Sequence, residues 1–498
     1  MLNITTFLDA NLRRLDKPVF LCPERDTSYT SKEILSIASE IARRLKSLGV
    51  LRGDGVILYL NSSPEYLFSY IAVWRIGAVA VPTNRVYTKS ELAYMRENSG
   101  AKVIITDPKG KSTAEGLEAA VFVPENTDSF RSAEILPPEK TEFSDICQLQ
   151  YTSGTTGKPK GAMLTHGNWF TAIHNECDVL MMRQDDVYLG IYPMGHVGLS
   201  WGFAALRAGA LYIMMERYDP ERYLALCREY KVTVLAGMPP VIHSLTEAPA
   251  GTEEMVKTVR EIISGGGPLH HETWKKFHYR YQIPVVNAYG LSETVVIGTG
   301  TAIRPEDYAT ADRFQSVGHP VCFSEVKIVD ELDPSVEMPR GTAGEIALRG
   351  PATALGYWNM PEETKAVFLD DGWFLTGDIG YLDKDERLCI TDRKKDMIVM
   401  SGWKIYPTEV ENALMAFEGV REIAVFSLPH EHRGEIPAAA VVWKGGSGDA
   451  ETNAEKLLSF AKEHLAGYKV PRKIITVDEL PRVNGWKLLR RVLREQYS

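Results

Sequence analysis

A regular alternation of short apolar runs with longer amphipathic segments constrains the fold of this chain more than any other feature. Apolar runs at residues 55–60 and 77–82 are separated by a helical segment that opens at Ser63-Pro64-Glu65 and carries Tyr66 to Arg75. Further apolar runs lie at residues 102–106, 186–192, 210–215, 232–235, 262–267 and 285–289. Strands that alternate with helices of about ten to fifteen residues form mostly parallel, doubly wound sheets. We therefore expect an α/β fold whose ligands bind where strands end in loops.

One early helix can be delimited at both ends. Thr30 and Glu33 have the spacing of a capping box, and the apolar residues that follow repeat with a helical period. Gly49 supplies a typical C-terminal stop. A helix is therefore expected over residues 31–48, whereas the acidic, proline-containing residues 108–142 are expected to form surface linkage.

After residue 320 the pattern of the sequence changes from alternating strands and helices to short strands. Short strands are expected at residues 326–329, 344–348 and 381–390, which indicates a β-rich subdomain over about residues 320–394. The charged residues 392–396 then mark a boundary. Beyond it we expect helices at about residues 407–417 and 453–465 and strands at residues 423–426, 438–442 and 473–477. We expect a large N-terminal domain (1–394) and a small, hinged C-terminal α+β domain (395–498).

Bulk properties exclude several classes of protein. The formal net charge of −9 argues against a nucleic-acid-binding surface. The six cysteines show no CxxC or metal-ligand spacing, and residues 1–7 lack the basic and apolar regions of a signal peptide. The apolar run from Tyr66 to Val81 contains Arg75 and Gly77 and is too short to span a bilayer. These properties are typical of a cytoplasmic enzyme.

The stretch Tyr151-Thr-Ser-Gly-Thr-Thr-Gly-Lys-Pro-Lys-Gly161 can form a phosphate-binding loop between two strands. It holds three glycines, four Ser/Thr hydroxyls, two lysines and no carboxylate. Glycines allow backbone N–H groups to approach a polyphosphate closely. A P-loop NTPase needs a Ser or Thr after Gly-Lys, but Pro159 follows Gly157-Lys158, so that class is excluded.

This stretch resembles the signature loop of the adenylate-forming superfamily, which includes acyl-CoA synthetases, luciferases and nonribosomal-peptide adenylation domains. The resemblance implies that the loop binds the β- and γ-phosphates of ATP, the leaving group. Its nucleotide-binding residues would be Thr152, Ser153, Gly154, Thr155, Thr156, Gly157 and Lys158.

Three further motifs match the same family in the expected order. Ala288-Tyr289-Gly290-Leu291-Ser292-Glu293 resembles its Tyr-Gly-x-Thr-Glu motif, which implies that Tyr289 stacks on adenine, Ser292 touches phosphate and Glu293 coordinates Mg²⁺. The turn Gly265-Gly266-Gly267-Pro268-Leu269 would run along the adenine and the acyl tunnel. The motif that ends in Asp378 would bind the ribose hydroxyls, with Arg393 as its companion.

The C-terminal segment resembles the part of the family that serves both half-reactions. Lys395 matches the hinge residue, and Gly402, Trp403 and Lys404 belong to the segment that lines the pantetheine tunnel. Lys487 matches the lysine that bridges the substrate carboxylate and the α-phosphate. The segment before it departs from the family pattern, with Val483 and Trp486 where threonine and glycine are usual.

His196 helps to choose among branches of the family. Acyl- and aryl-CoA synthetases often carry a histidine here, whereas amino-acid adenylation domains place an aspartate nearby, and no carboxylate lies between Tyr192 and Trp201. The expected pocket walls at residues 196–201, 237–240, 265–267 and 295–298 are mostly small or apolar. They favour an aromatic, alicyclic or medium-chain acid and leave the acid itself open.

Together the motifs predict an AMP-forming acid–CoA ligase that uses ATP, Mg²⁺ and coenzyme A, with Lys487, His196 and Glu293 as catalytic residues. A small-molecule acid is the expected substrate, and a homodimer is a possible assembly. Two alternatives stay open: an adenylating enzyme that passes its acyl group to a carrier protein or to oxygen, and a non-catalytic nucleotide-binding member of the fold.

Overall fold

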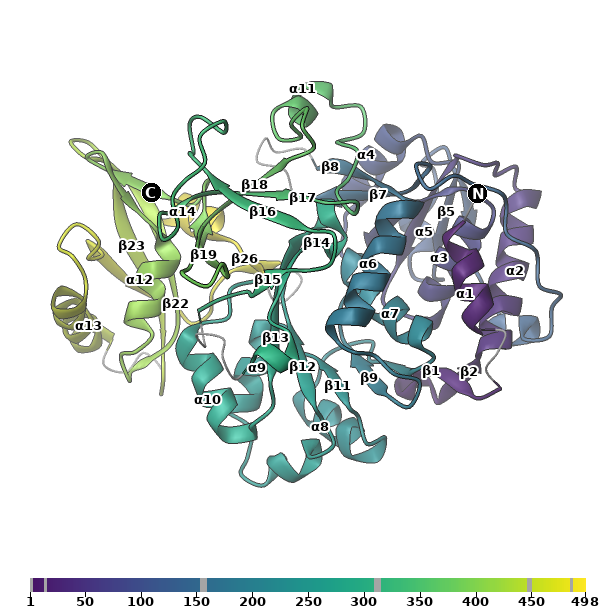
Figure 1. Cartoon of the computed structure of the whole chain (residues 1–498), viewed down its shortest axis with the longest axis horizontal. Helices are drawn as coiled ribbons and strands as arrows, with labels where there is room; N and C mark the ends of the chain where they lie inside the picture. Colours follow the sequence, from purple (N-terminus) through teal and green to yellow (C-terminus); the bar gives the residue numbers. More distant parts are fainter. Residues whose placement is uncertain (1–2, 13–15, 153–158, 309–314, 446–449, 484–486) are drawn as a thin grey trace.

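A large body and a smaller C-terminal unit make up the molecule. The structure, a computed structural model, describes residues 3–12, 16–152, 159–308, 315–445, 450–483 and 487–498. In Figure 1 the large body runs from purple to green, and the C-terminal unit is yellow-green to yellow. In these ranges no helix is both long and apolar enough to cross a membrane.

The first sheet of the large body has the strand order β6-β5-β3-β4-β7-β8. Its members are β3 (Gly55–Leu60), β4 (Val79–Asn84), β5 (Val103–Thr106), β6 (Ala120–Phe122), β7 (Ile146–Thr152) and β8 (Lys160–Thr165). The first five strands in this order pair in parallel, and β8 pairs antiparallel with β7. The segment 108–142 is therefore more than linkage: β6 and the short helix α5 (Lys111–Ala114) lie in it, and both are too short for a periodic pattern.

The second sheet has the order β15-β14-β13-β12-β11-β9-β10-β1-β2. Its members are β1 (Pro18–Cys22), β2 (Thr27–Thr30), β9 (Val187–Gly190), β10 (Leu211–Met214), β11 (Val234–Ala236), β12 (Glu261–Ser264), β13 (Val285–Leu291), β14 (Val296–Ala302) and β15 (His319–Pro320). Its central strands, from β13 to β1, pair in parallel. The two sheets confirm the expected doubly wound α/β architecture.

Helices cover both sheets and join them. The larger ones are α1 (Ile4–Leu12), α2 (Ser31–Ser47), α3 (Pro64–Arg75), α4 (Lys89–Ser99), α6 (His166–Val179), α7 (Ser200–Ala208), α8 (Pro220–Glu229), α9 (Pro239–Thr246) and α10 (His271–Tyr281). The expected capping box of α2 is present, because the Thr30 side chain accepts from Glu33 N–H and Glu33 accepts from Thr30 N–H. Helices α9 and α10 have no counterpart in the sequence prediction.

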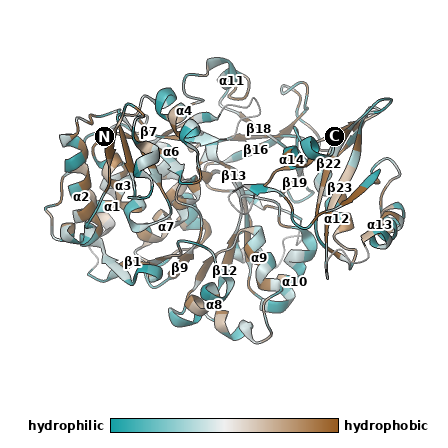
Figure 2. Cartoon of the chain, turned by 180° about the vertical axis from the view of Figure 1, so that it is seen from behind, coloured by the Kyte–Doolittle hydropathy of each residue, from teal (hydrophilic) through white to brown (hydrophobic). Residues whose placement is uncertain are grey.

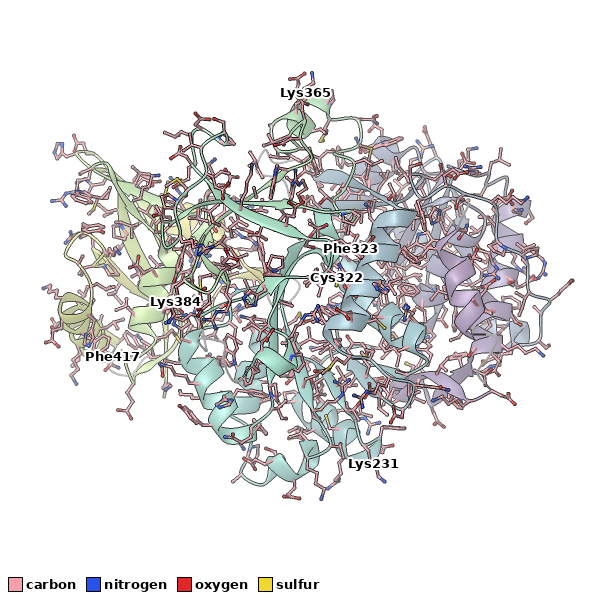
Figure 3. All side chains as sticks on the ribbon, viewed as in Figure 1. Lys231, Cys322, Phe323, Lys365, Lys384 and Phe417 are labelled. Carbon is pink, nitrogen blue, oxygen red and sulfur yellow. The ribbon has the colours of Figure 1, made fainter. Side chains whose placement is uncertain are left out.

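The core of the large body lies where α6 meets both sheets. Helix α6 contacts β8 of the first sheet and β14 of the second. Trp74 of α3, Trp169 of α6 and Phe203 of α7 are fully buried, and the ring centroid of Trp74 lies 5.0 Å from that of Trp169 and 5.3 Å from that of Phe203. Figure 2 shows apolar residues, in brown, along the central strands, and exposed charged side chains such as Lys231 and Lys365 project at the margin in Figure 3.

The expected β-rich subdomain is present, and it is a four-stranded antiparallel sheet. It contains β16 (Glu325–Val329), β17 (Gly344–Arg349), β18 (Phe374–Leu382) and β19 (Leu388–Arg393), with the short helix α11 (Pro361–Lys365) nearby in sequence. The single strand expected over residues 381–390 is wrong, because these residues form the end of β18, a turn and the start of β19. The Asp383 carboxylate accepts from the backbone N–H groups of Asp385 and Arg387, which stabilises this turn.

The C-terminal unit is an α+β structure, as expected. Strands β20 (Ile398–Met400), β21 (Trp403–Ile405), β22 (Val420–His430), β23 (Gly434–Trp443) and β24 (Lys473–Thr476) form one sheet, and β25 (Arg482–Val483) pairs with β26 (Lys487–Leu488). Helices α12 (Pro407–Leu414), α13 (Ala450–His464) and α14 (Arg490–Tyr497) accompany them. The helices and strands expected after residue 396 are all present, with shifts of a few residues at their ends.

Candidate active site

The expected phosphate loop connects β7 and β8, which confirms that it joins two strands. The register pairs Thr152 with Lys160 across the hairpin. Six of the predicted nucleotide-binding residues lie outside the described residues: Ser153, Gly154, Thr155, Thr156, Gly157 and Lys158. The hairpin therefore fixes where the loop leaves and re-enters the sheet.

Glu293 lies beside this hairpin. It belongs to the 3₁₀ turn η5 (Ser292–Thr294) after β13, and this turn contacts both β7 and β8. The buried Glu293 carboxylate accepts a hydrogen bond from the Tyr357 hydroxyl, with 2.9 Å between Oε1 and the hydroxyl oxygen. Tyr357 is itself tied to the hairpin, because it bridges to Ala162 of β8. The segment that carries Tyr357 thus connects β8, the second strand of the phosphate-loop hairpin, with Glu293, the predicted magnesium ligand.

Tyr357 is not among the site residues predicted from the sequence. Burial and the Glu293 carboxylate raise the pKa of Tyr357 well above its usual value, so the hydroxyl remains protonated and donates. The adjacent Trp358 donates its indole N–H to the Asn98 carbonyl and its backbone N–H to the Gly161 carbonyl. The sequence feature that could have identified Tyr357 as a site residue is its position between Gly356 and Trp358.

Two motifs that are distant in sequence meet at Tyr289 and Asp378. The Tyr289 hydroxyl donates to Asp378 Oδ2 at 2.8 Å, and Arg393 Nε lies 3.4 Å from Asp378 Oδ1. Burial raises the pKa of Asp378, against the lowering effects of Arg393 and the Tyr289 hydroxyl. The structure therefore brings together the residues predicted to contact adenine and ribose.

The predicted glycine turn adjoins the same strand. It follows β12, which pairs in parallel with β13 and places Ser264 beside Asn287. A Cβ atom added to Gly265 would lie 3.3 Å from the Ala288 carbonyl oxygen, and Gly266 has a φ of +81°. Within β13, a Cβ on Gly290 would lie 1.7 Å from the Val296 carbonyl oxygen, so the chain requires glycine there.

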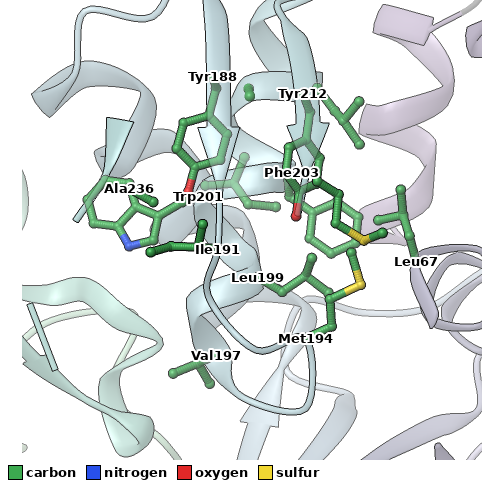
Figure 4. Close-up of a cluster of buried hydrophobic side chains, with 14 of the residues drawn as sticks. Leu67, Tyr188, Ile191, Met194, Val197, Leu199, Trp201, Phe203, Tyr212 and Ala236 are labelled. Atoms are coloured by element: carbon green, nitrogen blue, oxygen red, sulfur yellow. The ribbon is translucent and has the colours of Figure 1, made fainter. Parts of the chain in front are cut away.

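The segment that carries His196 lies between β9 and α7. The Gly195 carbonyl accepts a hydrogen bond from Gln150 of β7, and a Cβ on Gly195 would lie 2.7 Å from the Thr83 carbonyl oxygen of β4. The segment therefore packs against the first sheet near the start of the phosphate loop. Figure 4 shows its apolar side chains, among them Met194, Val197 and Leu199, in the cluster around Tyr188 and Tyr212. His196 itself is half-buried.

The predicted hinge segment is held by hydrogen bonds from both sides. The Asp392 carboxylate accepts from the backbone N–H of Arg393 and from that of Thr408, at 2.7 and 2.6 Å. Asp392 thereby caps the N-terminus of α12, whose own preceding residue makes no side-chain cap. Burial raises the pKa of Asp392 to about 6, although Arg490 and the Thr408 N–H oppose this shift.

Ion pairs on either side of the hinge were not singled out from the sequence. Arg490 Nη2 makes two contacts with the Glu411 carboxylate, at 2.7 and 2.8 Å, and Arg490 Nε donates to the Val425 carbonyl. On the other side, Lys394 Nζ lies 2.7 Å from Glu345 Oε2. Lys395 follows directly in the chain and is exposed. Both ion pairs join residues far apart in sequence, which a local pattern does not reveal.

The residues predicted for the CoA step lie together at the β20–β21 hairpin. Ser401 and Gly402 form its turn with φ values of +51° and +84°, as a two-residue hairpin turn of type I′ requires. The exposed Trp403 ring stacks on Tyr468 with 4.8 Å between centroids, and Lys404 Nζ lies 2.7 Å from Glu331 Oε1 of the large body.

Lys487 lies in β26, where the register pairs it with Val483 of β25. Its side chain and residues 484–486, which include the unusual Trp486, lie outside the described residues. Strand β25 begins at Arg482, whose Nη2 donates to Glu422 at 2.6 Å. Strands β25 and β26 thus define the backbone on either side of residues 484–486. The role of the Lys487 ammonium stays a prediction.

Comparison with known proteins places this architecture in a family. A family model described as AMP-binding enzyme matches residues 7–358, and a second, AMP-binding enzyme C-terminal domain, matches residues 409–485. The chain belongs to the adenylate-forming superfamily of AMP-binding enzymes. ATP-dependent adenylate formation is the chemistry of this family, and the chain is an adenylate-forming ligase of this group.

Curated relatives in the superfamily are similar over nearly the whole chain. A 4-coumarate–CoA ligase of Oryza sativa subsp. japonica is 31% identical over 504 residues, which cover 97% of this chain and 90% of that protein. A long-chain-fatty-acid–CoA ligase of Mycobacterium tuberculosis is 32% identical, with 96% and 94% covered. The crystal structure of ATP-bound MatB from Rhodopseudomonas palustris matches with a TM-score of 0.90 and 31% identity, covering 100% of this chain and 99% of that one.

Proposed function

We propose that this protein is an AMP-forming acid–CoA ligase. In the first half-reaction a substrate carboxylate attacks the α-phosphorus of ATP and pyrophosphate leaves. In the second, the thiol of coenzyme A attacks the acyl-adenylate and AMP leaves. The observation that supports this proposal most is the convergence of Tyr289, Asp378 and Arg393 beside the turn that holds Glu293, next to the phosphate-loop hairpin.

The residues on the nucleotide side have separate roles in this proposal. Asp378, with Arg393 beside it, accepts hydrogen bonds from the ribose hydroxyls, and Tyr289 contacts adenine next to the glycine turn 265–267. Ser292 and the phosphate loop hold the phosphates. Charge that builds on the α-phosphate oxygens is stabilised by Lys487, the predicted adenylation lysine.

Glu293 fits the requirements of a magnesium site. Mg²⁺ prefers oxygen ligands and is usually held by one or two carboxylates together with substrate phosphates. Among the described residues no cluster of three or more His, Cys, Asp or Glu side chains could form a dedicated metal cage. Glu293 supplies one carboxylate beside the hairpin, and the Tyr357 hydroxyl orients it. Mg²⁺ would neutralise charge on the β- and γ-phosphates.

The two half-reactions divide between the two units of the molecule. We place the boundary at Lys395, between an adenylation domain (1–394) and a mobile domain (395–498). Rotation about Lys395 would withdraw Lys487 and present the Gly402 turn, with Trp403 and Lys404, to coenzyme A. His196 would lie next to the acid carboxylate and the route of the thiol.

The acid is left open by family membership, since the relatives are named for chemically different acids, 4-coumarate and long-chain fatty acids. The proposed pocket walls at residues 196–201, 237–240, 265–267 and 295–298 favour an aromatic, alicyclic or medium-chain acid. Two alternatives remain: transfer of the acyl group to a carrier protein or to oxygen, and a nucleotide-binding protein without turnover.

Pyrophosphate release with a panel of acids, with and without coenzyme A, tests the proposal. A ligase releases pyrophosphate only when an acid is present, and forms AMP and an acyl-CoA thioester in equal amounts when coenzyme A is added. Acid-dependent release that yields no thioester would favour the carrier-protein alternative. No release with any acid would favour the nucleotide-binding alternative and refute the ligase.

A further inference from the structure

Glu331 receives one lysine from each side of the proposed hinge. It lies in the large body, in the turn that follows β16. Lys394, which directly precedes Lys395, donates from Nζ to the Glu331 backbone carbonyl at 2.8 Å. Lys404, nine residues after Lys395 on β21, has its Nζ 2.7 Å from Glu331 Oε1. The backbone and the side chain of Glu331 thus contact different units of the molecule.

The turn that carries Glu331 is fixed by bonds within the large body. Asp330 Oδ1 accepts from the backbone N–H groups of Leu332 and Asp333, at 2.8 and 3.0 Å. The Asp330 N–H donates to the Val336 carbonyl at 2.9 Å. None of these three bonds involves the C-terminal unit, so the turn does not depend on how that unit is oriented.

The Lys394 ammonium joins this turn to the loop that carries Asp378. Its Nζ also lies 2.7 Å from Oε2 of Glu345, a buried residue of β17. Glu345 Oε1 accepts from the Gly377 N–H at 3.1 Å, and the Gly377 carbonyl accepts from the Lys394 backbone N–H at 2.9 Å. Gly377 directly precedes Asp378, the predicted ribose contact. A continuous set of hydrogen bonds therefore runs from the ribose loop to Glu331.

The two lysines make contacts of different strength. Lys394 neutralises the buried Glu345 carboxylate, which would be costly to leave without a partner. Lys404 reaches Glu331 across the boundary between the units, and 48% of its side chain is exposed. Ion pairs with an exposed partner are weak and exchange readily with water. Rotation about Lys395 can therefore break the Lys404 pair and leave the Lys394 contacts in place.

We propose that Glu331 is a positioning residue that holds the C-terminal unit in the adenylation orientation through Lys404. The bonds of Lys394 connect this latch to the loop of Asp378, which couples the nucleotide side of the site to the orientation of the unit. The proposal rests on the proposed function, since it assumes rotation about Lys395. While Glu331 holds the Lys404 ammonium, that ammonium does not serve coenzyme A, so the pair belongs to the first half-reaction and breaks before the second.

Glu331→Gln tests the latch. It removes the charge that attracts Lys404 and keeps the backbone carbonyl that Lys394 uses. We expect acyl-adenylate formation to slow by about three- to fivefold, the effect of losing one partly exposed ion pair. Thioester formation from supplied acyl-adenylate and coenzyme A should be as fast as in wild type or faster, because that step needs the pair broken. Single-turnover assays of each half-reaction measure the difference.

A double variant assigns the effect to the pair. Lys404→Gln should slow adenylate formation by the same factor, and Glu331→Gln combined with Lys404→Gln should be no slower than either alone. Glu325→Gln is the matched control, because Glu325 lies on β16, just before the turn of Glu331, and pairs with Arg349 inside the large body. It should leave both half-reactions unchanged.

The outcomes separate this proposal from the proposed function. Equal loss in both half-reactions of Glu331→Gln, or no loss in either, overturns the latch and leaves the ligase intact. Additive losses in the double variant, or an equal loss in Glu325→Gln, also overturn it. Where Glu331→Gln does not fold, adenylate formation by Lys404→Gln decides in the same way. An absence of pyrophosphate release by wild type with every acid refutes the ligase and, with it, this role of Glu331.

Discussion

At the scale of single residues, the candidate site depends on tyrosine hydroxyls that orient its carboxylates through hydrogen bonds. Glu293 is buried beside the phosphate-loop hairpin, and its Oε1 accepts from the Tyr357 hydroxyl at 2.9 Å. Asp378 is held in the same way by Tyr289. A hydrogen bond to a charged group contributes about 1.5–3 kcal/mol. The aromatic hydroxyls are therefore expected to affect catalysis without a contact to the reacting atoms.

Tyr357→Phe tests this expectation. Loss of the hydroxyl removes a hydrogen bond that orients the Glu293 carboxylate, so we expect kcat/KM for ATP to fall by roughly tenfold or more, with a higher Mg²⁺ concentration needed for half-maximal rate. Steady-state pyrophosphate release across a Mg²⁺ titration measures both effects. Tyr279→Phe is the control, because Tyr279 is 71% exposed on α10. Equal Mg²⁺ dependence in wild type and Tyr357→Phe would contradict the positioning role.

Asp392 gives a prediction for the pH dependence of stability. Its pKa in the folded protein, about 6, is above its ordinary value of 3.8. Its stabilising contribution is therefore fully present below about pH 3.8 and is lost as the pH rises through about 6. Between these pH values the unfolding free energy of wild type should fall by up to roughly 3 kcal/mol relative to that of Asp392→Asn. Urea midpoints across this range measure the difference.

Asp383 provides a control of opposite sign. Hydrogen bonds from the backbone N–H groups of Arg387 and Asp385 hold the pKa of Asp383 below its ordinary value, although burial opposes this. Its ionised form therefore stabilises the fold above that ordinary value, and the contribution is lost as the pH falls. Relative to Asp383→Asn, wild type should gain stability as the pH rises. If the unfolding free energies of the two variants, each relative to wild type, changed with pH in the same direction, the pKa of Asp392 would not be raised.

At the scale of elements, local chemistry explains why some boundaries could be predicted and others could not. The helix α2 was predictable because Thr30 and Glu33 form its capping box within four residues of chain. The hairpin of β18 and β19 was missed because its turn, around Asp383 and Arg387, lacks a glycine or proline to mark it. Strand β6 has three residues, too few to show a period.

Only those residues of the candidate site that lie in sequence motifs could be predicted. Sequence patterns singled out Tyr289, Asp378 and Glu293, and the structure adds the hydrogen bond between Tyr289 and Asp378. The bonds of Tyr357 to Glu293 and of Arg490 to Glu411 connect residues 64 and 79 positions apart. Such contacts depend on the packing of whole sheets and domains, which no single segment encodes.

The β20–β21 turn carries a prediction at the scale of elements. Gly402 has a φ of +84°, where an alanine costs about 1 kcal/mol or more, and no atom lies within 4 Å of an added Cβ. Gly402→Ala should therefore slow the thioester step several-fold through strain in the turn. It should affect pyrophosphate release without coenzyme A much less. Single-turnover assays of each half-reaction measure the two effects.

Gly445→Ala is the matched control for this turn. Gly445 lies in the same C-terminal unit, has a φ of +78°, and also has open space around an added Cβ. It should cost similar stability without a selective loss of the thioester step. If both variants slow thioester formation equally, strain in the unit as a whole, rather than the Gly402 turn, limits that step.

At the scale of the whole molecule, polar contacts join the two units within the described part of the chain. Lys404 pairs with Glu331, Asp392 caps α12 through Thr408, and His270 Nδ1 lies 2.8 Å from Asn412 Oδ1. The buried apolar clusters of the two units are separate. An interface of polar contacts can be exchanged at low cost, which suits a small domain that serves two half-reactions in turn.

Lys487→Ala tests this division of labour. If the Lys487 ammonium stabilises charge on the α-phosphate, its removal should slow acyl-adenylate formation by roughly 10²–10³-fold. Thioester formation from supplied acyl-adenylate and coenzyme A should be largely retained, because that step uses the Gly402 turn. Arg491→Ala is the control, since Arg491 is an exposed cation on the adjacent helix α14 and pairs with Glu495. Equal loss in both half-reactions would mean that Lys487 holds the domain in place, and the assignment of catalysis to it would fail.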